Sequence, residues 1–563
     1  MSRSIRWIVL TFFLLMPASF HAQNTKSVVL EALRAEMARS LEHFKKLPNP
    51  PYFLSYEVME TESGSTVGSY GALAGSSPVT RTRMLGIDLR VGSYALDNTR
   101  PIRGAFPNLP DTFSAYQLPV DDDLDAVRAL VWYYTDQKYK RAVEQFIAVK
   151  TNVQVKAQET DRSGDFSPSK AETYSEPAAP PLTFDRNVWE DRVRKYTAPF
   201  QRYGNIYSAQ AQITTQRETH WFVSSDGASI QTADTSYRLM ISAFAKASDG
   251  MELPLYESFY SSTSDGLPND AEVLQKVDKM IKSLMALKLA PVMEPYVGPA
   301  IMSPRSTGVI FHEIFGHRIE GQREKRENQS QTLRDRVGQQ VLPEFLSVFS
   351  DPTARKYGAT ELAGFYKFDD EGVRARKVTV VENGILKNFL MSRLPVDGFP
   401  ESNGHGRRNI TRPVAGRQSN LLVVASQTVT PEELKKKLIE EVGKRKLPYG
   451  LYFEDIEGGF TAVGRAVPNF FEVIPTMVYR VYPDGREELV RGVDLIGTAL
   501  STFNKILAAD NQSAAFNGIC GAESGRVPVS AGGPGLLFSE IEVQKKAKSQ
   551  ELSPILGPPS DDR

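Results

Sequence analysis

The sequence is short of cysteine, of net charge and of long hydrophobic runs. Cys520 is the only cysteine among 563 residues, which excludes an intramolecular disulfide. Lysine plus arginine and aspartate plus glutamate both total 67, and the sequence has no basic block. We therefore expect neither nucleic acid nor an anionic membrane surface as a partner.

The conspicuous apolar run, Trp7 to Met16, lies near the amino terminus behind Arg3 and Arg6, and small residues follow it. This order is typical of a secretory signal peptide, which we assign to residues 1–22 without fixing the cleavage position. The run is too short to span about 30 Å of hydrocarbon, and no later segment is long enough, so we expect no stable membrane anchor. The sequence predicts an exported protein, periplasmic in a Gram-negative bacterium and otherwise extracellular.

The length allows two domains, which we place at residues 23–290 and 291–545. In the first, the order helix, strands, helix occurs twice, which predicts an α+β domain. The predicted helices are 26–46, 124–149, 187–202 and 270–287, and the predicted strands fill 51–96 and 205–259. Residues 158–181 are rich in Ser, Pro, Glu and Asp and predict an exposed polar excursion, and the polar residues 546–563 predict a disordered tail.

Strands dominate the second half. Asn383-Gly384 and Asp484-Gly485 predict hairpin turns because these pairs tolerate positive φ, and residues 431–446 predict a charged helix. Glycines scattered through this half indicate sharp corners in a sheet. We therefore predict an α+β protein whose C-terminal half is strand-rich and barrel-like.

The clearest chemical signal is the pattern H-E-x-x-x-H, from His312 to His317. In the familiar H-E-x-x-H motif the histidines are four residues apart and lie about 40° apart around a helix. A spacing of five splays them by about 140° on an ideal helix, so one metal can bind both only if the turn is widened, as in a π-bulge. We expect Gly316 to tolerate that distortion, Ser306 or Thr307 to cap the helix, and Gly321 to end it.

Glu313, next to the first histidine, is the group that a hydrolytic zinc site needs. Zinc lowers the pKa of bound water to about 7, and a neighbouring carboxylate takes the proton as the water attacks a carbonyl. The alternative is a buried helix whose two histidines are satisfied by backbone or carboxylate partners.

A catalytic zinc usually has three protein ligands and one water. Besides His312 and His317, Cys520 is the residue that offers a thiolate, in the stretch Asn517 to Gly521. The alternative is a buried, inert thiol, which is the usual fate of a free cysteine. With Cys520 as third ligand, the chain would hold one zinc.

At this point the sequence resembles the TldD/PmbA family of metalloproteases over roughly residues 295–545. The resemblance is carried by H-E-x-x-x-H, by S-N-G-x-G-R-R at Ser402 to Arg408, by D-L-I-G at Asp494 to Gly497, and by G-x-C-G ahead of V-P-V. It implies that His312, His317 and Cys520 bind zinc and that Glu313 is the base, as in the catalytic, TldD-like branch. It further implies a homodimer, or a heterodimer with a PmbA-like chain, that cleaves unfolded peptides with little sequence specificity.

A glycine-flanked loop carries His405, Arg407 and Arg408, which could bind a substrate backbone or carboxylate, with His405 steadying an oxyanion. The alternative is an exposed loop with ordinary surface arginines. His43 and His220 have no supporting pattern, and we interpret them as structural.

Two other functions compete with this one. A dipeptidyl-peptidase III-like zincin also has a residue inserted before the second histidine, but it takes its third ligand from a glutamate within E-E-C-R-A-type sequence, which Glu440-Glu441 lacks. A non-catalytic binding or assembly protein would close its zinc site with a fourth protein ligand.

Overall fold

The computed structural model describes residues 27–102, 115–154, 161–177, 179–325, 329, 331–461, 463–464 and 470–546. The predicted signal peptide lies outside these residues, and so does the predicted disordered tail except for Lys546. In the part of the chain that is described, no helix has both the length and the apolar character needed to cross a membrane.

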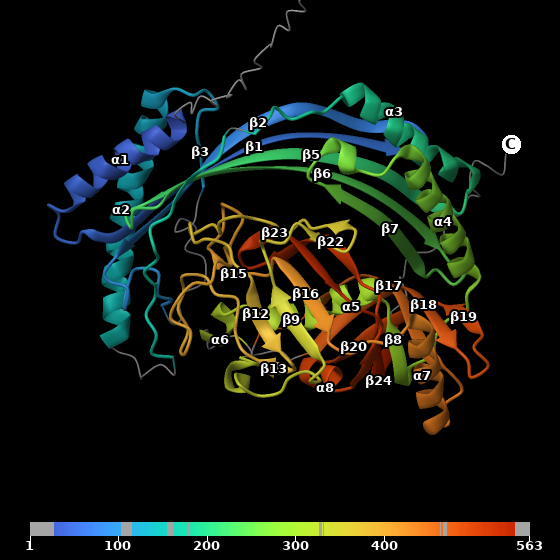
Figure 1. The fold of residues 1–563 in the computed structure, drawn as a ribbon. Coiled ribbons are helices and arrows are strands. Elements are labelled where there is room, and N and C mark those ends of the chain that lie inside the picture. The colour runs from blue at the N-terminus through green and yellow to red at the C-terminus, as the bar shows by residue number, and fades with distance from the viewer. Residues whose placement is uncertain are drawn as a thin grey trace, which may run out of the picture.

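The N-terminal half is one arched sheet with helices on its convex side (Figure 1). The strand order is β3-β2-β1-β5-β6-β4, with β7 also paired to β6, and all pairs are antiparallel except β4 with β6. Helices α1 and α2 pack at one end, and α3 and α4 cover the convex face at the other end. The elements are α1 (Val28–Phe44), β1 (Pro51–Ser69), β2 (Ala72–Val91), β3 (Tyr116–Gln117), α2 (Leu124–Gln154), β4 (Thr173–Ser175), α3 (Arg186–Thr197), β5 (Ile206–Ser224), β6 (Ser229–Lys246), β7 (Glu252–Ser261) and α4 (Asp270–Leu289).

The predicted helices and strand regions of this half are confirmed, but the first strand region is simpler than its sequence suggests. Instead of several short strands, residues 51–91 form one long hairpin whose turn is Tyr70-Gly71, with φ of 47° and 76°. The strands continue through polar residues because β1 is paired on both sides, with β2 and with β5. Backbone pairing therefore extends these strands well beyond their apolar segments.

The predicted exposed excursion at residues 158–181 is wrong at Asp161 and at residues 165–167, which are buried, whereas the described residues from 168 to 181 are exposed or partly exposed. Phe166 is buried, with the guanidinium of Arg90 3.7 Å from its ring centroid and that of Arg393 4.0 Å away. Asp165 accepts hydrogen bonds from Arg100 and from the backbone of Asp97, and β4 adds to the edge of the arched sheet. The composition-based prediction failed at these residues because composition does not show where a polar side chain lies. A polar side chain with hydrogen-bond partners inside the protein looks the same in the sequence as one that faces water.

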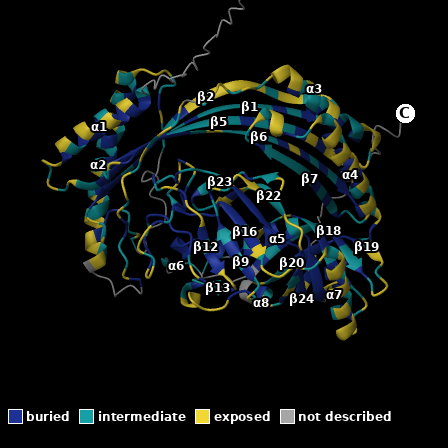
Figure 2. Ribbon diagram, in the orientation of Figure 1, coloured by how far each residue is buried: buried dark blue, intermediate teal, exposed yellow. Residues whose placement is uncertain are grey.

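The C-terminal half contains a closed five-stranded barrel, in which β17, β8, β24, β20 and β18 pair in that order and β18 pairs again with β17. This confirms the barrel-like prediction. A six-stranded sheet, β13-β12-β9-β16-β23-β22, lies beside the barrel, with α5 packed against β17, β22 and β23. Figure 2 shows that the inner strands of this half are largely buried.

The elements of this half are β8 (Tyr296–Met302), α5 (Pro304–Ile310), α6 (Gln322–Lys325), β9 (Leu346–Ser350), β10 (Lys356–Tyr357), β11 (Thr360–Glu361), β12 (Val378–Glu382), β13 (Ile385–Leu386), β14 (Gly406–Arg407), β15 (Ala415–Gly416), β16 (Asn420–Ala425), α7 (Pro431–Lys444), β17 (Gly450–Thr461), β18 (Phe470–Val481), β19 (Glu487–Val490), β20 (Val493–Thr498), α8 (Ala499–Phe503), β21 (Ile506–Ala509), β22 (Ala514–Ala522), β23 (Gly525–Gly533) and β24 (Leu536–Lys545). The hairpin turns at Asn383-Gly384 and Asp484-Gly485 are confirmed, with φ of 78° at Gly384 and 83° at Gly485.

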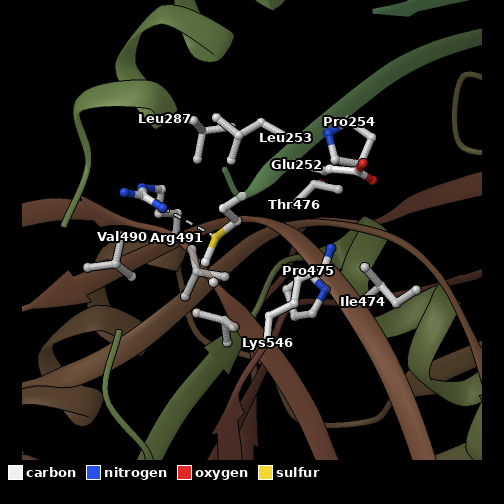
Figure 3. Close-up of a pocket in the computed structure, with 14 residues that line it drawn as sticks. Glu252, Leu253, Pro254, Leu287, Ile474, Pro475, Thr476, Val490, Arg491 and Lys546 are labelled. Carbon is white, nitrogen blue, oxygen red and sulfur yellow. Dashed lines mark hydrogen bonds between the residues drawn. The ribbon is translucent and has the colours of Figure 1, made fainter. Parts of the chain in front are cut away.

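A partly buried ion pair joins the two halves. Arg491, which follows β19, binds Asp249 at 2.9 Å and donates to the carbonyl of Ala290 at 2.9 Å. Figure 3 shows the small hollow beside it, about 30 Å³ in volume, with Leu253 and Leu287 from the N-terminal half facing Pro475 and Val490 from the C-terminal half. This hollow is too small for a peptide, and none of its lining residues belongs to the H-E-x-x-x-H motif.

Candidate metal centre

The motif begins in α5, whose cap differs from the prediction. The Ser303 side chain accepts a hydrogen bond from the backbone N–H of Ser306 at 3.1 Å, and Pro304 occupies the first turn. Ser306 and Thr307, the predicted caps, lie inside the helix and are buried. Proline at the first helical position fixes the start one residue after Ser303, because its missing N–H costs nothing there.

After Ile310 the backbone leaves α-helical geometry and forms a π-helical turn over Phe311–Phe315, followed by a 3₁₀ turn over Gly316–Arg318. The π-helical turn is the widening that the five-residue spacing requires. It brings the rings of His312 and His317 to a centroid separation of 5.2 Å. The helical stretch is therefore not one regular helix, and it ends at Arg318 rather than at Gly321.

Gly316 is required for a different reason from the one predicted. Its φ of −58° and ψ of −44° are ordinary helical values, so the backbone there needs no glycine. A Cβ at this position would lie 1.9 Å from Oε1 of Gln418. The Gln418 side chain occupies that space and donates a hydrogen bond to the carbonyl of His312 at 3.2 Å, which fixes the turn that carries the first histidine.

Cys520 lies on β22, the edge strand of the six-stranded sheet, and completes a three-residue cluster. Its Sγ is 3.4 Å from Nε2 of His317, and ligand atoms of His312, His317 and Cys520 all lie within 4.8 Å of one another. All three side chains are buried. The structure thus brings together the three predicted ligands, two from a helical turn and one from a strand.

The charges of these groups suit a divalent metal. Burial by itself would raise the pKa of the Cys520 thiol, but the imidazoles of His312 and His317 hold it well below its ordinary value. Burial would likewise lower the pKa of His317, but Glu320 and Cys520 raise it to about 10. Nδ1 of His312 is buried and has no hydrogen-bond partner among the described residues. A thiolate, an orphaned imidazole nitrogen and a second imidazole are the donor set of a zinc site, where the metal replaces the protons.

Glu313 lies beside this cluster without belonging to it. Burial raises the pKa of its carboxyl, although His312 and His317 act in the opposite direction, and the carboxylate accepts a hydrogen bond from the backbone of Gly459 on β17. Among the described residues, the cluster of possible metal ligands at this place consists of the two histidines and Cys520 and does not include Glu313. This is the arrangement expected of a proton acceptor next to a metal, rather than of a fourth ligand.

Three residues that the sequence reasoning missed surround the cluster. Glu320 contacts His317, Arg417 donates to the sulfur of Cys520, and Gln418 holds the π-helical turn. Glu320 follows His317 by three residues, a proximity in sequence that could have signalled the contact even though Glu320 lies just beyond the helical stretch. Arg417 and Gln418 approach only through the tertiary fold.

The three predicted substrate-binding residues are engaged elsewhere. His405 is fully buried, its Nε2 lies 3.0 Å from the hydroxyl of Ser350, and burial lowers its pKa to about 3, so it is a neutral core residue. Arg407 donates to the carbonyls of Gln418 and Pro528, at 2.8 Å each. Arg408 pairs with Glu57 on β1. The prediction that His405 steadies an oxyanion is wrong, because the ring contacts Ser350 and not the metal cluster.

His220, interpreted as structural, takes part in a second cluster. Its Nε2 lies 2.9 Å from Glu57, and Asp370 is close to both residues. Arg408 already neutralises Glu57 there, so this cluster is an ion-pair network between the two halves and not a metal site. Glu440 and Glu441, which a dipeptidyl-peptidase III-like site would need, lie on α7, where Glu441 pairs with Lys444.

Comparison with known proteins identifies similar metalloproteases. Residues 296–545 match the model of the PmbA/TldA metallopeptidase C-terminal domain. A metalloprotease of Methanothermobacter thermautotrophicus is 27% identical over 58% of this chain and 68% of its own length. A zinc metalloprotease TldD homolog of Saccharolobus solfataricus is 26% identical over 44% of this chain and 51% of its own length.

The fold is also found among solved structures. The crystal structure of TldE from Thermococcus kodakarensis superposes with a TM-score of 0.59, covering 91% of this chain and 100% of that chain. The sequence identity is 12%, so this similarity concerns the fold alone. It extends over both halves, whereas the family model covers only the C-terminal half.

Proposed function

We propose that this chain, whose residues 296–545 match the PmbA/TldA metallopeptidase C-terminal domain, is an exported zinc-dependent peptidase of the TldD/PmbA family. Its proposed substrates are unfolded or extended peptides, cleaved with low sequence specificity. The observation that carries the proposal is the convergence of His312, His317 and Cys520 beside Glu313.

His312, His317 and Cys520 would hold one zinc, which when bound polarises the substrate carbonyl and acidifies a water molecule. Glu313 accepts the proton of the attacking water and returns it to the leaving amine. Its burial keeps it a stronger base than an exposed carboxylate, because desolvation disfavours the ionised form. Three protein donors leave an open coordination position, which supports catalysis over a closed structural site.

The substrate proposal is supported by the edge of β17. This strand pairs with β8 only over Leu451–Phe453, whereas its pairing with β18 continues to Thr461. Glu457, Gly459 and Phe460 are exposed, and Gly459 contacts Glu313. An extended peptide that adds to this edge would be held by backbone hydrogen bonds, with little dependence on its side chains, and would lie beside the base.

Export and assembly complete the proposal. Export is supported by the charged and apolar pattern of the first 22 residues. A homodimer, or a heterodimer with a PmbA-like chain, is supported by the resemblance to the family. Fractionation of cells and the mass of the purified particle in solution test these two points.

The central test is to incubate the purified protein with unstructured peptides, with and without a chelator, and to map the cuts by mass spectrometry. We expect cleavage that stops on chelation and returns with zinc. A stably folded protein should resist cleavage, and the same protein should be cut once denatured. Equal rates on the two forms would contradict the substrate class, and zinc binding without any cleavage would favour a structural metal.

A further inference from the structure

Cys520 and His317 belong to a closed ring of buried contacts. Arg417 donates through Nη2 to Sγ of Cys520 at 3.1 Å, and its Nε lies 3.2 Å from Oε1 of Glu320. The other oxygen of Glu320 lies 3.2 Å from Nδ1 of His317, whose Nε2 faces the cysteine sulfur at 3.4 Å. Arg417 and Glu320 are both completely buried.

The position of Arg417 is fixed by hydrogen bonds from both terminal nitrogens of its guanidinium, while Nε makes only the ionic contact with Glu320. Nη2 donates to both the sulfur and the carbonyl of Cys520, each at 3.1 Å, which fixes the side chain of this residue relative to its own backbone. Nη1 donates to the hydroxyl of Ser524 at 2.8 Å and to the carbonyl of Gly525 at 3.1 Å. A planar fork of donors is needed for these contacts, and lysine, with one nitrogen, cannot make them all.

A cation against the sulfur has a chemical consequence. A thiolate gives a metal more electron density than an imidazole does, and a strong hydrogen bond to the sulfur withdraws part of that density. The metal then stays more electrophilic than a thiolate ligand would otherwise allow. Glu320 balances the charge of Arg417 and at the same time fixes the orientation of the His317 ring, as a carboxylate commonly does for a histidine that binds a metal.

We infer that Arg417 is a positioning residue that holds Cys520 as a metal ligand and weakens the electron donation of its sulfur to the metal. Glu320 couples this effect to the second ligand, His317. The inference rests on the proposed function, since it presumes that Cys520 binds the metal.

The test replaces zinc with Co²⁺ in the full-length protein and records the sulfur-to-cobalt charge-transfer band. Arg417→Gln removes the cation from the sulfur, so its electrons are held less tightly and the band should move to longer wavelength. Arg417→Lys keeps the positive charge but makes fewer contacts, so its band should lie between those of the wild type and Arg417→Gln. Peptide hydrolysis per bound zinc should fall about 10- to 100-fold in Arg417→Gln, the usual range for residues that support a metal ligand.

Arg323→Gln is the matched control. Arg323 is buried like Arg417 and binds Glu320 at 2.6 Å, but its hydrogen bonds go to Glu320, Glu523 and Gln329 rather than to the sulfur of Cys520. Its band should shift less than that of Arg417→Gln, because Arg323 contacts Glu320 and not the sulfur. If Arg417→Gln fails to fold, Arg417→Lys still has to show a shift to longer wavelength.

Two outcomes separate the inference from the proposed function. A folded, cobalt-loaded Arg417 variant whose band matches the wild type overturns the role of Arg417 while leaving the peptidase intact. If the wild-type protein binds Co²⁺ but shows no sulfur-to-cobalt band, Cys520 is not a metal ligand. That outcome would overturn both this inference and the proposed ligand set.

Discussion

Glu313 differs from its two neighbours in the motif because its carboxylate reaches toward β17 while the imidazoles of His312 and His317 turn toward Cys520. The three side chains are close in sequence, but the π-helical turn separates their directions. Proton transfer and metal binding are therefore assigned to different residues, and substitutions can separate them.

Glu313→Gln should retain zinc and the fold but lose peptide hydrolysis by at least about a hundredfold, because a positioned general base contributes about 10² to 10⁴-fold. Metal analysis and single-substrate kinetics on the same preparation measure both quantities. Wild-type turnover in a zinc-loaded variant would exclude Glu313 as the base.

Cys520→Ser should lose most of its zinc, since a hydroxyl is a much poorer zinc ligand than a thiolate. His405→Gln is the control, because this buried histidine contacts Ser350 rather than the cluster and its replacement should leave zinc in place. Metal content after dialysis against a weak chelator measures the difference. Full occupancy in Cys520→Ser would mean that the third ligand is a different residue.

At the scale of elements, the catalytic geometry depends on β17 lying close to the π-helical turn. A Cβ on Gly459 would lie 2.8 Å from the carbonyl oxygen of Glu472 and 3.2 Å from Cγ of Glu313, whereas one on Gly458 would meet nothing within 4 Å. The backbone of β17 therefore has room for a side chain at Gly458 but not at Gly459.

Gly459→Ala should reduce hydrolysis about ten- to a hundredfold with zinc retained, because displacing the base by a fraction of an ångström misaligns proton transfer. Gly458→Ala, the neighbouring substitution, should leave the rate nearly unchanged. Steady-state kinetics with one unstructured peptide compares the two. Equal rates would show that contact between β17 and Glu313 does not set the position of the base.

At the scale of the whole molecule, the arch and the C-terminal half are held together by buried charges. Burial alone would raise the pKa of Glu57, but Arg408, with help from His220, lowers it to about 2. A carboxyl whose pKa is depressed on folding stabilises the protein above its ordinary pKa of 4.5, and this contribution is lost as the pH falls toward 2.

Glu57→Gln should therefore lower the free energy of unfolding by about 3 kcal/mol at neutral pH, as expected when one partner of a buried pair is removed. The difference from the wild type should shrink between pH 4.5 and about 2. Denaturant titrations at several pH values measure it. Glu42→Gln on the exposed surface of α1 should change little at any pH, and a constant difference for Glu57→Gln would contradict the assignment.

The sequence by itself determined the features that are encoded locally. Helical periodicity and turn pairs such as Asn383-Gly384 predicted most elements, because short-range sterics and amphipathicity fix them. The five-residue spacing of His312 and His317 also required a widened turn, since helix geometry leaves no other way to bring the two rings together.

Only the tertiary structure decided which distant groups meet. In the folded protein Arg417 contacts Cys520, and Glu57 pairs with Arg408 and His220. Phe166 is buried between two arginines, and Gln418 fills the space that Gly316 leaves. Contacts between residues this far apart in the chain leave no spacing pattern in one sequence. A buried arginine is therefore indistinguishable there from a surface one until the fold supplies its partner.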